Sequence, residues 1–205
     1  MQSFKTINRS AATVAFSQSY QGRNHHHVLL LLIHSKGFEG AISIRDSSNE
    51  LVVLGLCEGN HCSESRKSDR GNGLLVAMKK KISNDGSSCA WETERSIKIP
   101  KSAFFKDYSS ATIDERGRVA IASQEDSAIW VGQLLGQDEE TGLWDLDKVR
   151  FDDDVGKIFF FPKNHNCETI YCNIEGIHWI NHEMIIAVSD KMKSHGRQDF
   201  RYVWF

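Results

Sequence analysis

Short runs of apolar residues alternate with polar turns along most of the chain. The runs at 41–45, 73–79, 95–100, 127–134 and 156–162 are rich in β-branched, aromatic or other apolar residues, and Gly, Asn, Asp and Ser separate them. Segments of this length and composition are typical of β-strands. No stretch long enough for a stable helix has helical periodicity. The pattern therefore predicts an all-β protein.

One unit of this pattern occurs three times, and the copies start about 66–70 residues apart. Each copy has an aromatic residue or Ile, two further residues, a short strand, a polar turn and a second strand that ends in a small residue. A polar cluster closes the copy. The first strands are predicted at 41–45, 111–114 and 177–180, and "RYVWF" at 201–205 is predicted as the third strand of the last copy.

Four antiparallel strands in each repeat are typical of a β-propeller blade. The blades are predicted at about 36–105, 106–171 and 172–205, whereas residues 1–35 form a leader that does not match the repeat. The fold class expected is a partial β-propeller of about two and three-quarter blades, because the last copy stops before its outer strand. A β-sandwich with coincidental internal similarity is the alternative.

Three stretches carry a resemblance to a known family: "KGFEGAISI" with "LVVLGLCEGN", "SSATIDERGRVAIASQEDSAIWVGQL", and "NIEGIHWINHEMIIAVSDK". They resemble blades of the phytase-like, quorum-regulated β-propeller superfamily, and look closest to uncharacterised plant proteins of that type. The resemblance covers roughly residues 36–200. It implies a propeller fold and, through the phytase-like members, a metal-dependent phosphoesterase activity.

Two of the copies place a glutamate and a glycine directly before the predicted first strand, as Glu39-Gly40 and Glu175-Gly176. The second strand of a blade returns antiparallel to the first, so residues before the first strand and after the second lie on one face. The carboxylates predicted on this face, around the mouth of a central channel, are Glu39, Glu58, Glu125, Asp126, Glu175 and Asp190.

These carboxylates have three interpretations. Converging carboxylates repel one another unless a cation neutralises them, and several oxygen ligands from loops suit Ca²⁺. A calcium site is therefore one interpretation of this face, and calcium is the only cofactor that the sequence suggests. The competing interpretation is structural: each carboxylate accepts backbone N–H groups of a neighbouring blade and holds the blades together. The third interpretation is solvated loop charge.

Other candidate sites are weaker. Cys57-x4-Cys62 and Cys167-x4-Cys172 could supply four zinc ligands, but their spacing is loose for a zinc site and predicts buried or loop thiols instead. The three consecutive histidines at 25–27 would point in divergent directions on a strand, so they are predicted to belong to a solvated leader.

Two further features are predicted to be structural. Asp152–Asp154 lacks the alternating spacing of a calcium loop, so it is predicted as a charged turn. Trp130 and Trp179 lie within predicted strands and are expected in the core.

Composition and charge argue against some classes of function and location. The net charge of −2 shows no basic field for nucleic acid, and the longest aliphatic run, 28–33, is too short to span a membrane. An odd count of five cysteines favours reduced thiols and a cytosolic or nuclear location. No signal peptide is evident.

We expect a binding or scaffold module that presents a carboxylate-rich channel mouth to a protein or a small polar ligand. The alternatives are a metal-dependent phosphoesterase and a truncated gene product without an independent function. An incomplete propeller would expose blade edges, so self-association and marginal stability of a fragment are also expected.

Overall fold

All regular structure in the described part of the chain is β-strand. The computed structural model describes residues 37–59, 71, 73–162, 174–189 and the backbone of 200–204. Its strands are β1 (Phe38–Arg45), β2 (Leu51–Cys57), β3 (Leu74–Ile82), β4 (Cys89–Lys98), β5 (Ser110–Ile113), β6 (Arg118–Ser123), β7 (Ala128–Leu135), β8 (Arg150–Phe160), β9 (Ile174–Asn181), β10 (Met184–Ser189) and β11 (Phe200–Trp204). The all-β prediction is confirmed. The described residues contain no apolar helix of membrane-spanning length.

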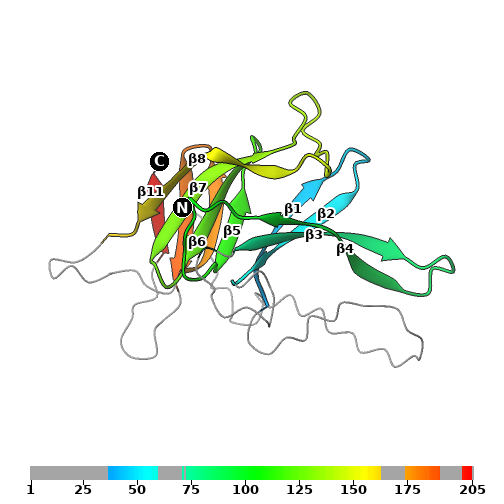
Figure 1. Cartoon of the computed structure of the whole chain (residues 1–205), viewed down its shortest axis with the longest axis horizontal. Helices are drawn as coiled ribbons and strands as arrows, with labels where there is room; N and C mark the ends of the chain where they lie inside the picture. Colours follow the sequence, from blue (N-terminus) through cyan, green and yellow to red (C-terminus); the bar gives the residue numbers. More distant parts are fainter. Residues whose placement is uncertain (1–36, 60–70, 72, 163–173, 190–199, 205) are drawn as a thin grey trace, which may run out of the picture.

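The strands form three antiparallel sheets, in which strands that are consecutive in the sequence pair with each other (Figure 1). The first sheet has the order β1-β2-β3-β4 and the second the order β5-β6-β7-β8. In the third sheet, β10 pairs with β9 on one side and with β11 on the other. The predicted four-stranded antiparallel unit is thus confirmed for two copies of the repeat. The predicted leader, 1–35, lies outside the described residues.

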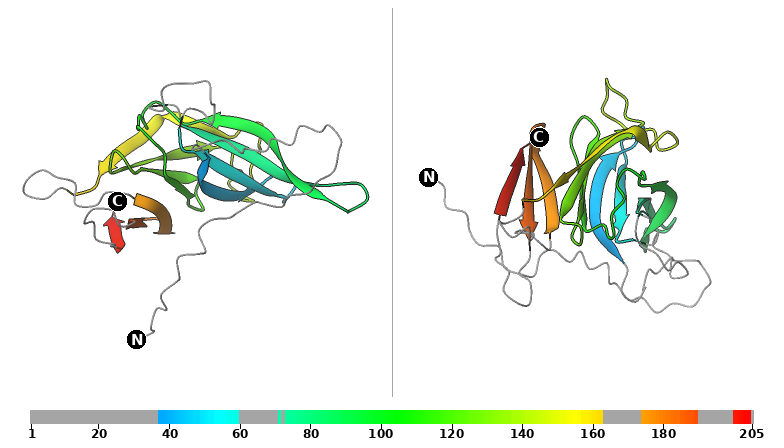
Figure 2. Two further views of the ribbon diagram at one scale, coloured as in Figure 1. Left: turned by 90° about the horizontal axis from the view of Figure 1, so that it is seen from below. Right: turned by 60° about the vertical axis from the view of Figure 1, so that its left-hand side comes forward.

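The three sheets lie face to face in the order of the sequence. β5 contacts β1 on one side and β9 on the other, whereas the outer strands β4 and β8 contact each other only slightly. The right-hand view of Figure 2 shows the sheets one beside the next. The first strands of the three copies therefore belong to separate sheets, as the repeat predicts, and the sheets come closest along these strands.

The second sheet is the middle layer, and it is apolar on both faces. β6 is buried from Val119 to Ser123 without the alternation of a half-exposed strand, which is typical of a strand covered on both sides. Val119 and Ile121 belong to a core shared with the first sheet. Ala120 and Ala122 belong to a core shared with the third sheet.

Hydroxyl side chains of β5 bond to the backbone of β9. Ser110 Oγ accepts the N–H of Ile177 at 3.2 Å, and Thr112 Oγ1 accepts the N–H of Trp179 at 3.4 Å. Buried hydroxyl groups need such partners, because an unpaired polar group in the core is costly. These bonds fix the position of β9 along β5, and with it the position of the third sheet relative to the second.

The last strand of the second sheet is longer than the sequence predicts. The expected range was 156–162, but β8 begins at Arg150 and ends at Phe160. The prediction of a charged turn at Asp152–Asp154 is wrong, because these residues belong to β8 at a break in its pairing with β7, opposite Gln133. Their side chains project from an edge strand, where charge is readily solvated.

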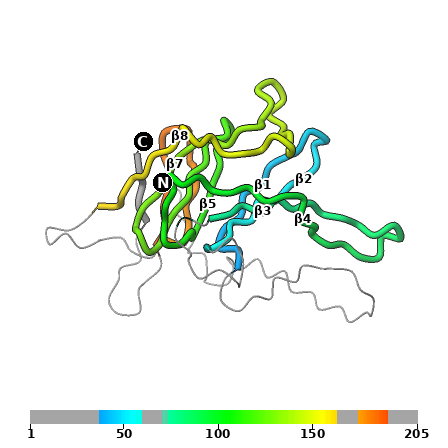
Figure 3. Tube along the Cα trace, in the orientation of Figure 1, coloured from blue at the N-terminus to red at the C-terminus, as the bar shows by residue number. Residues whose placement is uncertain are grey.

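In contrast, the β3–β4 hairpin extends away from the stacked sheets (Figure 3). Its outer half is polar: Lys80, Lys81 and Glu92 are exposed. Lys81 Nζ lies 3.4 Å from a carboxylate oxygen of Glu94 across the hairpin. Charged side chains on such an exposed hairpin disfavour pairing with other chains.

Trp130 and Trp179 are both in the core, with 0% and 5% exposure, which confirms their predicted role. Trp130 lies across two glycines of its own sheet. A Cβ added at Gly132 would come within 2.1 Å of the indole ring, and one added at Gly156 within 2.5 Å. Glycines inside strands often mark such a close approach.

We predict that Gly132→Ala destabilises the protein by about 1–3 kcal/mol, because the added methyl group displaces the Trp130 indole from a filled core. Urea unfolding followed by tryptophan fluorescence measures the change. Gly37→Ala is the matched control, since a Cβ there comes within 4 Å of no other described residue; it should change the stability by less than about 0.5 kcal/mol. Equal effects of the two substitutions would contradict the packing argument.

Candidate functional site

Glu39 and Glu175 occupy the same place in two sheets, at a β-bulge in the first strand. The pairing of β1 with β2 skips Glu39, and the pairing of β9 with β10 skips Glu175. A bulge re-aims the side chain of its extra residue, and both glutamates are exposed. The prediction that these residues precede the strands is wrong, because pairing continues beyond the bulge to Phe38 and Ile174.

The glycine after each bulge has a separate role. A Cβ on Gly40 would lie 3.1 Å from the backbone nitrogen of Ala111 and 3.3 Å from Cα of Ser110. Gly40 therefore lets β5 approach β1 closely. Gly176 is its equivalent in the third sheet, where Val188 is the one described residue whose atoms an added Cβ would meet within 4 Å.

Asp126, one of the predicted acidic residues, has a structural role. Its carboxylate accepts the backbone N–H of Lys106 at 2.7 Å, which joins the turn after β6 to the segment that leads into β5. The buried Asp107, which the sequence analysis missed, has the same kind of role: it accepts the hydroxyl of Ser123 and the N–H of Glu125 at 3.0 Å. Lys106 and Asp126 belong to the same copy of the repeat, so this bond is structural but does not join neighbouring blades as the structural interpretation expects.

Two of the remaining predicted carboxylates, Glu58 and Glu125, lie at the ends of second strands, directly or two residues after β2 and β6. The carbonyl oxygen of Glu58 accepts the N–H of Tyr108 at 2.7 Å, and Glu125 is exposed. Asp190 lies outside the described residues. Among the described residues, no three His, Cys, Asp or Glu side chains form a group that could hold a metal ion. Calcium binding at this end stays a prediction.

Cys57 is disulfide-bonded, so the prediction of reduced thiols is wrong for this residue. Cys89 is a free, exposed thiol. Cys62, Cys167 and Cys172 lie outside the described residues, as do the histidines at 25–27. The sequence could not predict the bond, because an odd count of cysteines leaves the pairing open.

At the opposite end, each first strand ends in an Asp or Asn that binds the following turn. Asp46 Oδ1 accepts the N–H groups two and four residues further on, both at 2.9 Å. Asp114 Oδ1 does the same at 3.0 and 2.8 Å, and Asn181 Oδ1 accepts the N–H two residues on at 2.8 Å. Such side chains stabilise tight turns. The sequence analysis missed this position, although Asp or Asn recurs there in all three copies.

The β7–β8 loop, residues 136–149, joins the second sheet to the first turn of the first sheet. Trp144 N donates to the carbonyl of Arg45 at 2.9 Å, and Ser47 N donates to the carbonyl of Trp144 at 2.9 Å. The guanidinium of Arg95, in β4, donates to the carbonyl of Leu146 in the same loop. This long loop of the second copy thus connects two sheets.

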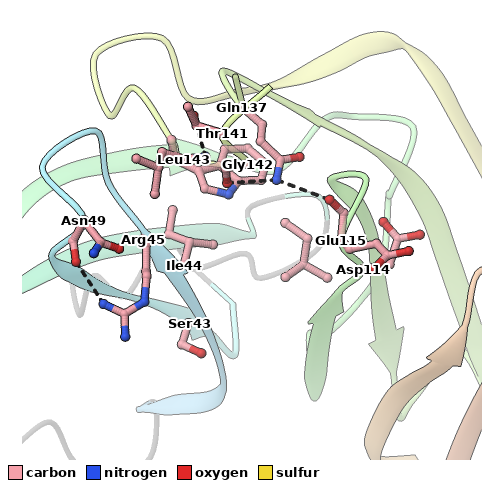
Figure 4. Close-up of a pocket in the computed structure, with 12 residues that line it drawn as sticks. Ser43, Ile44, Arg45, Asn49, Asp114, Glu115, Gln137, Thr141, Gly142 and Leu143 are labelled. Atoms are coloured by element: carbon pink, nitrogen blue, oxygen red, sulfur yellow. Dashed lines mark hydrogen bonds between the residues drawn. The ribbon is translucent and has the colours of Figure 1, made fainter. Parts of the chain in front are cut away.

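A cleft lies between this loop and the ends of β1 and β5, with a volume of about 470 Å³ (Figure 4). Its lining combines apolar, polar and charged side chains. The residues are Ser43, Ile44, Arg45, Asn49, Ile113, Asp114, Glu115, Gln137, Thr141, Gly142, Leu143 and Trp144. The Gln137 amide bridges the loop and the turn after β5, donating to the carbonyl oxygens of Glu115 at 3.2 Å and Gly142 at 3.1 Å.

Side chains of opposite charge line the two walls of the cleft. Arg45, on the first sheet, donates from Nη1 to the carbonyl of Asn49 at 2.8 Å, and it forms no ion pair with any described residue. On the second sheet, Asp114 pairs with Arg118 at 2.7 Å. Glu115 has no basic partner within the described part of the chain. Arg45 and Glu115 are therefore available to a ligand.

No protein-family model matches the chain, and neither the curated proteins nor the solved structures contain a match.

Asp46 holds the first turn through a buried ion pair. It is 3% exposed, and its carboxylate contacts Nζ of Lys79 in β3. Burial acts to raise the pKa of Asp46, but the hydrogen bond from Lys79 and the N–H groups of Glu50 and Ser48 outweigh it. The pKa of Asp46 is therefore below its ordinary value of 3.8. The hydrogen bond to Asp46 likewise raises the pKa of Lys79.

We predict that Asp46→Asn lowers the free energy of unfolding by about 1–3 kcal/mol at pH 7, because it leaves Lys79 without its buried anion. Because the pKa of Asp46 is lowered in the folded state, the ionised carboxylate stabilises the fold above pH 3.8. This stabilisation is lost as the pH falls below that value and the carboxylate becomes protonated. The difference between wild type and variant should therefore shrink at pH 3 in urea unfolding. Glu50→Gln is the control, since it removes the exposed carboxylate near Lys79. A difference that is unchanged at pH 3 would contradict the ion-pair explanation.

Proposed function

We propose that this chain is a ligand-binding module built on part of a β-propeller. Antiparallel sheets in sequence order, with their first strands adjacent, support this arrangement. Each sheet carries the same turn device at the end of its first strand, which also fits a repeated blade. The propeller corresponds to residues 36–205.

The binding site in this proposal is the cleft of about 470 Å³ between the first two sheets. It is the observation that carries the proposal, since small-ligand sites commonly measure about 300–1,000 Å³ and combine apolar walls with a few polar groups. Two sheets and the β7–β8 loop build the cleft, so its walls rest on paired strands. A site on rigid elements holds its side chains more exactly than a site on loops.

The charges of the cleft favour a dipolar ligand. The guanidinium of Arg45 suits a carboxylate, which it can bind through two parallel hydrogen bonds. The carboxylate of Glu115 suits an ammonium group. Between them, the apolar side chains of Ile44, Ile113 and Leu143 suit a hydrocarbon side chain. A short peptide with free termini carries all three groups.

Binding without catalysis is the simpler proposal. Hydrolysis of a phosphoester needs metal ligands together with several cationic groups around the phosphate. Arg45 is the one basic residue among those that line the cleft. The end of the sheets that carries Glu39, Glu125 and Glu175 offers the proposed module a second, acidic surface for a cationic partner.

We predict that the unblocked tripeptide Gly-Leu-Gly shifts the backbone amide signals of Gly142, Leu143 and Trp144 in ¹H–¹⁵N NMR spectra. Arg45→Gln and Glu115→Gln should each weaken binding about two- to fivefold, as expected for solvent-accessible ion pairs. The acetylated, amidated peptide should bind more weakly than the unblocked one.

Lys148→Gln is the matched control for this titration. Lys148 is an exposed cation of the same loop, pairs with Asp145 at 2.9 Å and does not line the cleft. It should leave the affinity unchanged. Equal affinity for blocked and unblocked peptides would overturn the dipolar-ligand proposal.

A further inference from the structure

The two charged residues proposed to bind the ends of a ligand are connected through the loop that closes the cleft. Arg45 is the last residue of β1, and Glu115 lies in the turn between β5 and β6. Each residue binds the β7–β8 loop through its backbone carbonyl oxygen, which leaves its charged side chain to the cleft. The loop structure between these two carbonyl groups therefore determines the spacing of the two walls.

On the first wall, the loop lies beside the end of β1. Trp144 N donates to the carbonyl of Arg45, and the carbonyl of Trp144 accepts the N–H of Ser47, both at 2.9 Å. The guanidinium of Arg45 is held by its own turn, since Nη1 donates to the carbonyl of Asn49 at 2.8 Å. Both the backbone and the charged group of Arg45 are thus positioned on this wall.

Inside the loop, two short arms pair with each other. Gln137 pairs with Trp144 in an isolated antiparallel bridge. Beside this bridge, Asp138 N donates to the carbonyl of Leu143 at 2.8 Å, and the Asp138 carboxylate accepts the N–H of Thr141 at 2.8 Å. The arm that carries Gln137 is therefore held to the arm that carries Trp144.

On the second wall, Gln137 and Trp144 contact the turn after β5. Nε2 of Gln137 donates to the carbonyl of Glu115 at 3.2 Å, and to that of Gly142 in its own loop at 3.1 Å (Figure 4). The Trp144 indole lies against Gly117 of the same turn, where an added Cβ would come within 3.1 Å of the ring. The loop thus holds a residue on either side of the cleft: Arg45 through Trp144, and Glu115 through Gln137.

We propose that Trp144 and Gln137 form a spacer that makes the cleft selective for the length of a dipolar peptide, with Gln137 as the specificity-determining residue. Each residue of an extended peptide adds at most about 3.3–3.6 Å, so peptides of different length place their charged ends at different separations. When the two walls keep a fixed spacing, one length reaches Arg45 and Glu115 together, and other lengths reach only one of them. The inference rests on the proposed peptide binding and deepens it.

The expected selectivity follows from the strength of one ion pair. A peptide that reaches only one of the two charges loses one solvent-accessible pair, which weakens binding about two- to fivefold. Without the hydrogen bond from Gln137, the turn that carries Glu115 is free to follow the end of the peptide. The difference between lengths should then disappear.

Titration of three unblocked peptides into the full chain tests the spacer. The probes are Gly-Leu, Gly-Leu-Gly and Gly-Leu-Gly-Gly, and the amide signals of Leu143 and Trp144 in ¹H–¹⁵N NMR spectra report their affinities. The wild-type chain should prefer one length by about two- to fivefold. Gln137→Met removes the amide and keeps an unbranched side chain of similar length, so it should bind all three peptides with nearly equal affinity. A wild-type chain with no preferred length would overturn the proposal.

Gln133→Met is the matched control. The Gln133 amide also donates to two carbonyl groups, those of Arg116 at 2.9 Å and Leu134 at 3.1 Å. It therefore holds the same turn to the second sheet itself, and Gln133 does not line the cleft. A role in the rigidity of the turn alone would give both variants the same effect. The Gln133 variant should instead keep the wild-type length preference, and loss of this preference in both variants would overturn the spacer.

Charge substitutions show whether a mismatched peptide reaches one wall only. Arg45→Gln and Glu115→Gln should both weaken binding of the preferred peptide. For the other two peptides, at least one of the two substitutions should leave the affinity unchanged, because the corresponding ion pair is already absent. Equal sensitivity of all three peptides to both substitutions would contradict the spacer.

The spacer and the binding proposal fail in different ways. A wild-type chain that binds none of the three peptides would reject the peptide-binding cleft, and the spacer with it. A chain that binds Gly-Leu-Gly through Arg45 and Glu115, but binds the other lengths equally well, would reject only the spacer.

Discussion

The second sheet has two apolar faces, and the rest of the structure depends on covering both of them. A sheet with one apolar face can leave the other in water, but β6, with Val119 and Ile121 on one side and Ala120 and Ala122 on the other, cannot. The first and third sheets supply the two covers. Because β5 lies between β1 and β9 and contacts both, the three sheets come closest along their first strands.

This stacking gives the two ends of the first strands different chemistry. At one end, bulges turn Glu39 and Glu175 outward, while the following glycine leaves space for a neighbouring backbone. At the other end, the carboxylates of Asp46 and Asp114 accept backbone N–H groups of the turns that they stabilise. The acidic residues at the bulges are thus exposed, and the carboxylates at the turns accept hydrogen bonds from the turn backbone. Residue type alone does not distinguish the two groups.

The cleft arises where the second copy departs from the repeat. In the described parts of the chain, only the second sheet has a loop of this kind between its third and fourth strands. Trp144 of this loop forms hydrogen bonds with the backbone on both sides of Asp46. The repeat provides the two walls, and the insertion closes the space between them. A loop carried by a rigid scaffold is where binding residues commonly lie.

The sequence by itself determined the strands, their order and their grouping into repeated antiparallel units. Alternation of apolar and polar residues is a local property, and the turn residues between consecutive strands, such as Asp114 before β6, act over a few positions. Only the tertiary structure decided which carboxylates are structural, where the cleft lies and that Cys57 is oxidised. The first two depend on partners distant in sequence: Asp46 on Lys79, Asp126 on Lys106, and Arg45 on Trp144. Contacts of that kind follow from how the sheets stack. The pattern of side chains along one strand contains no information about which residues of another sheet will face that strand.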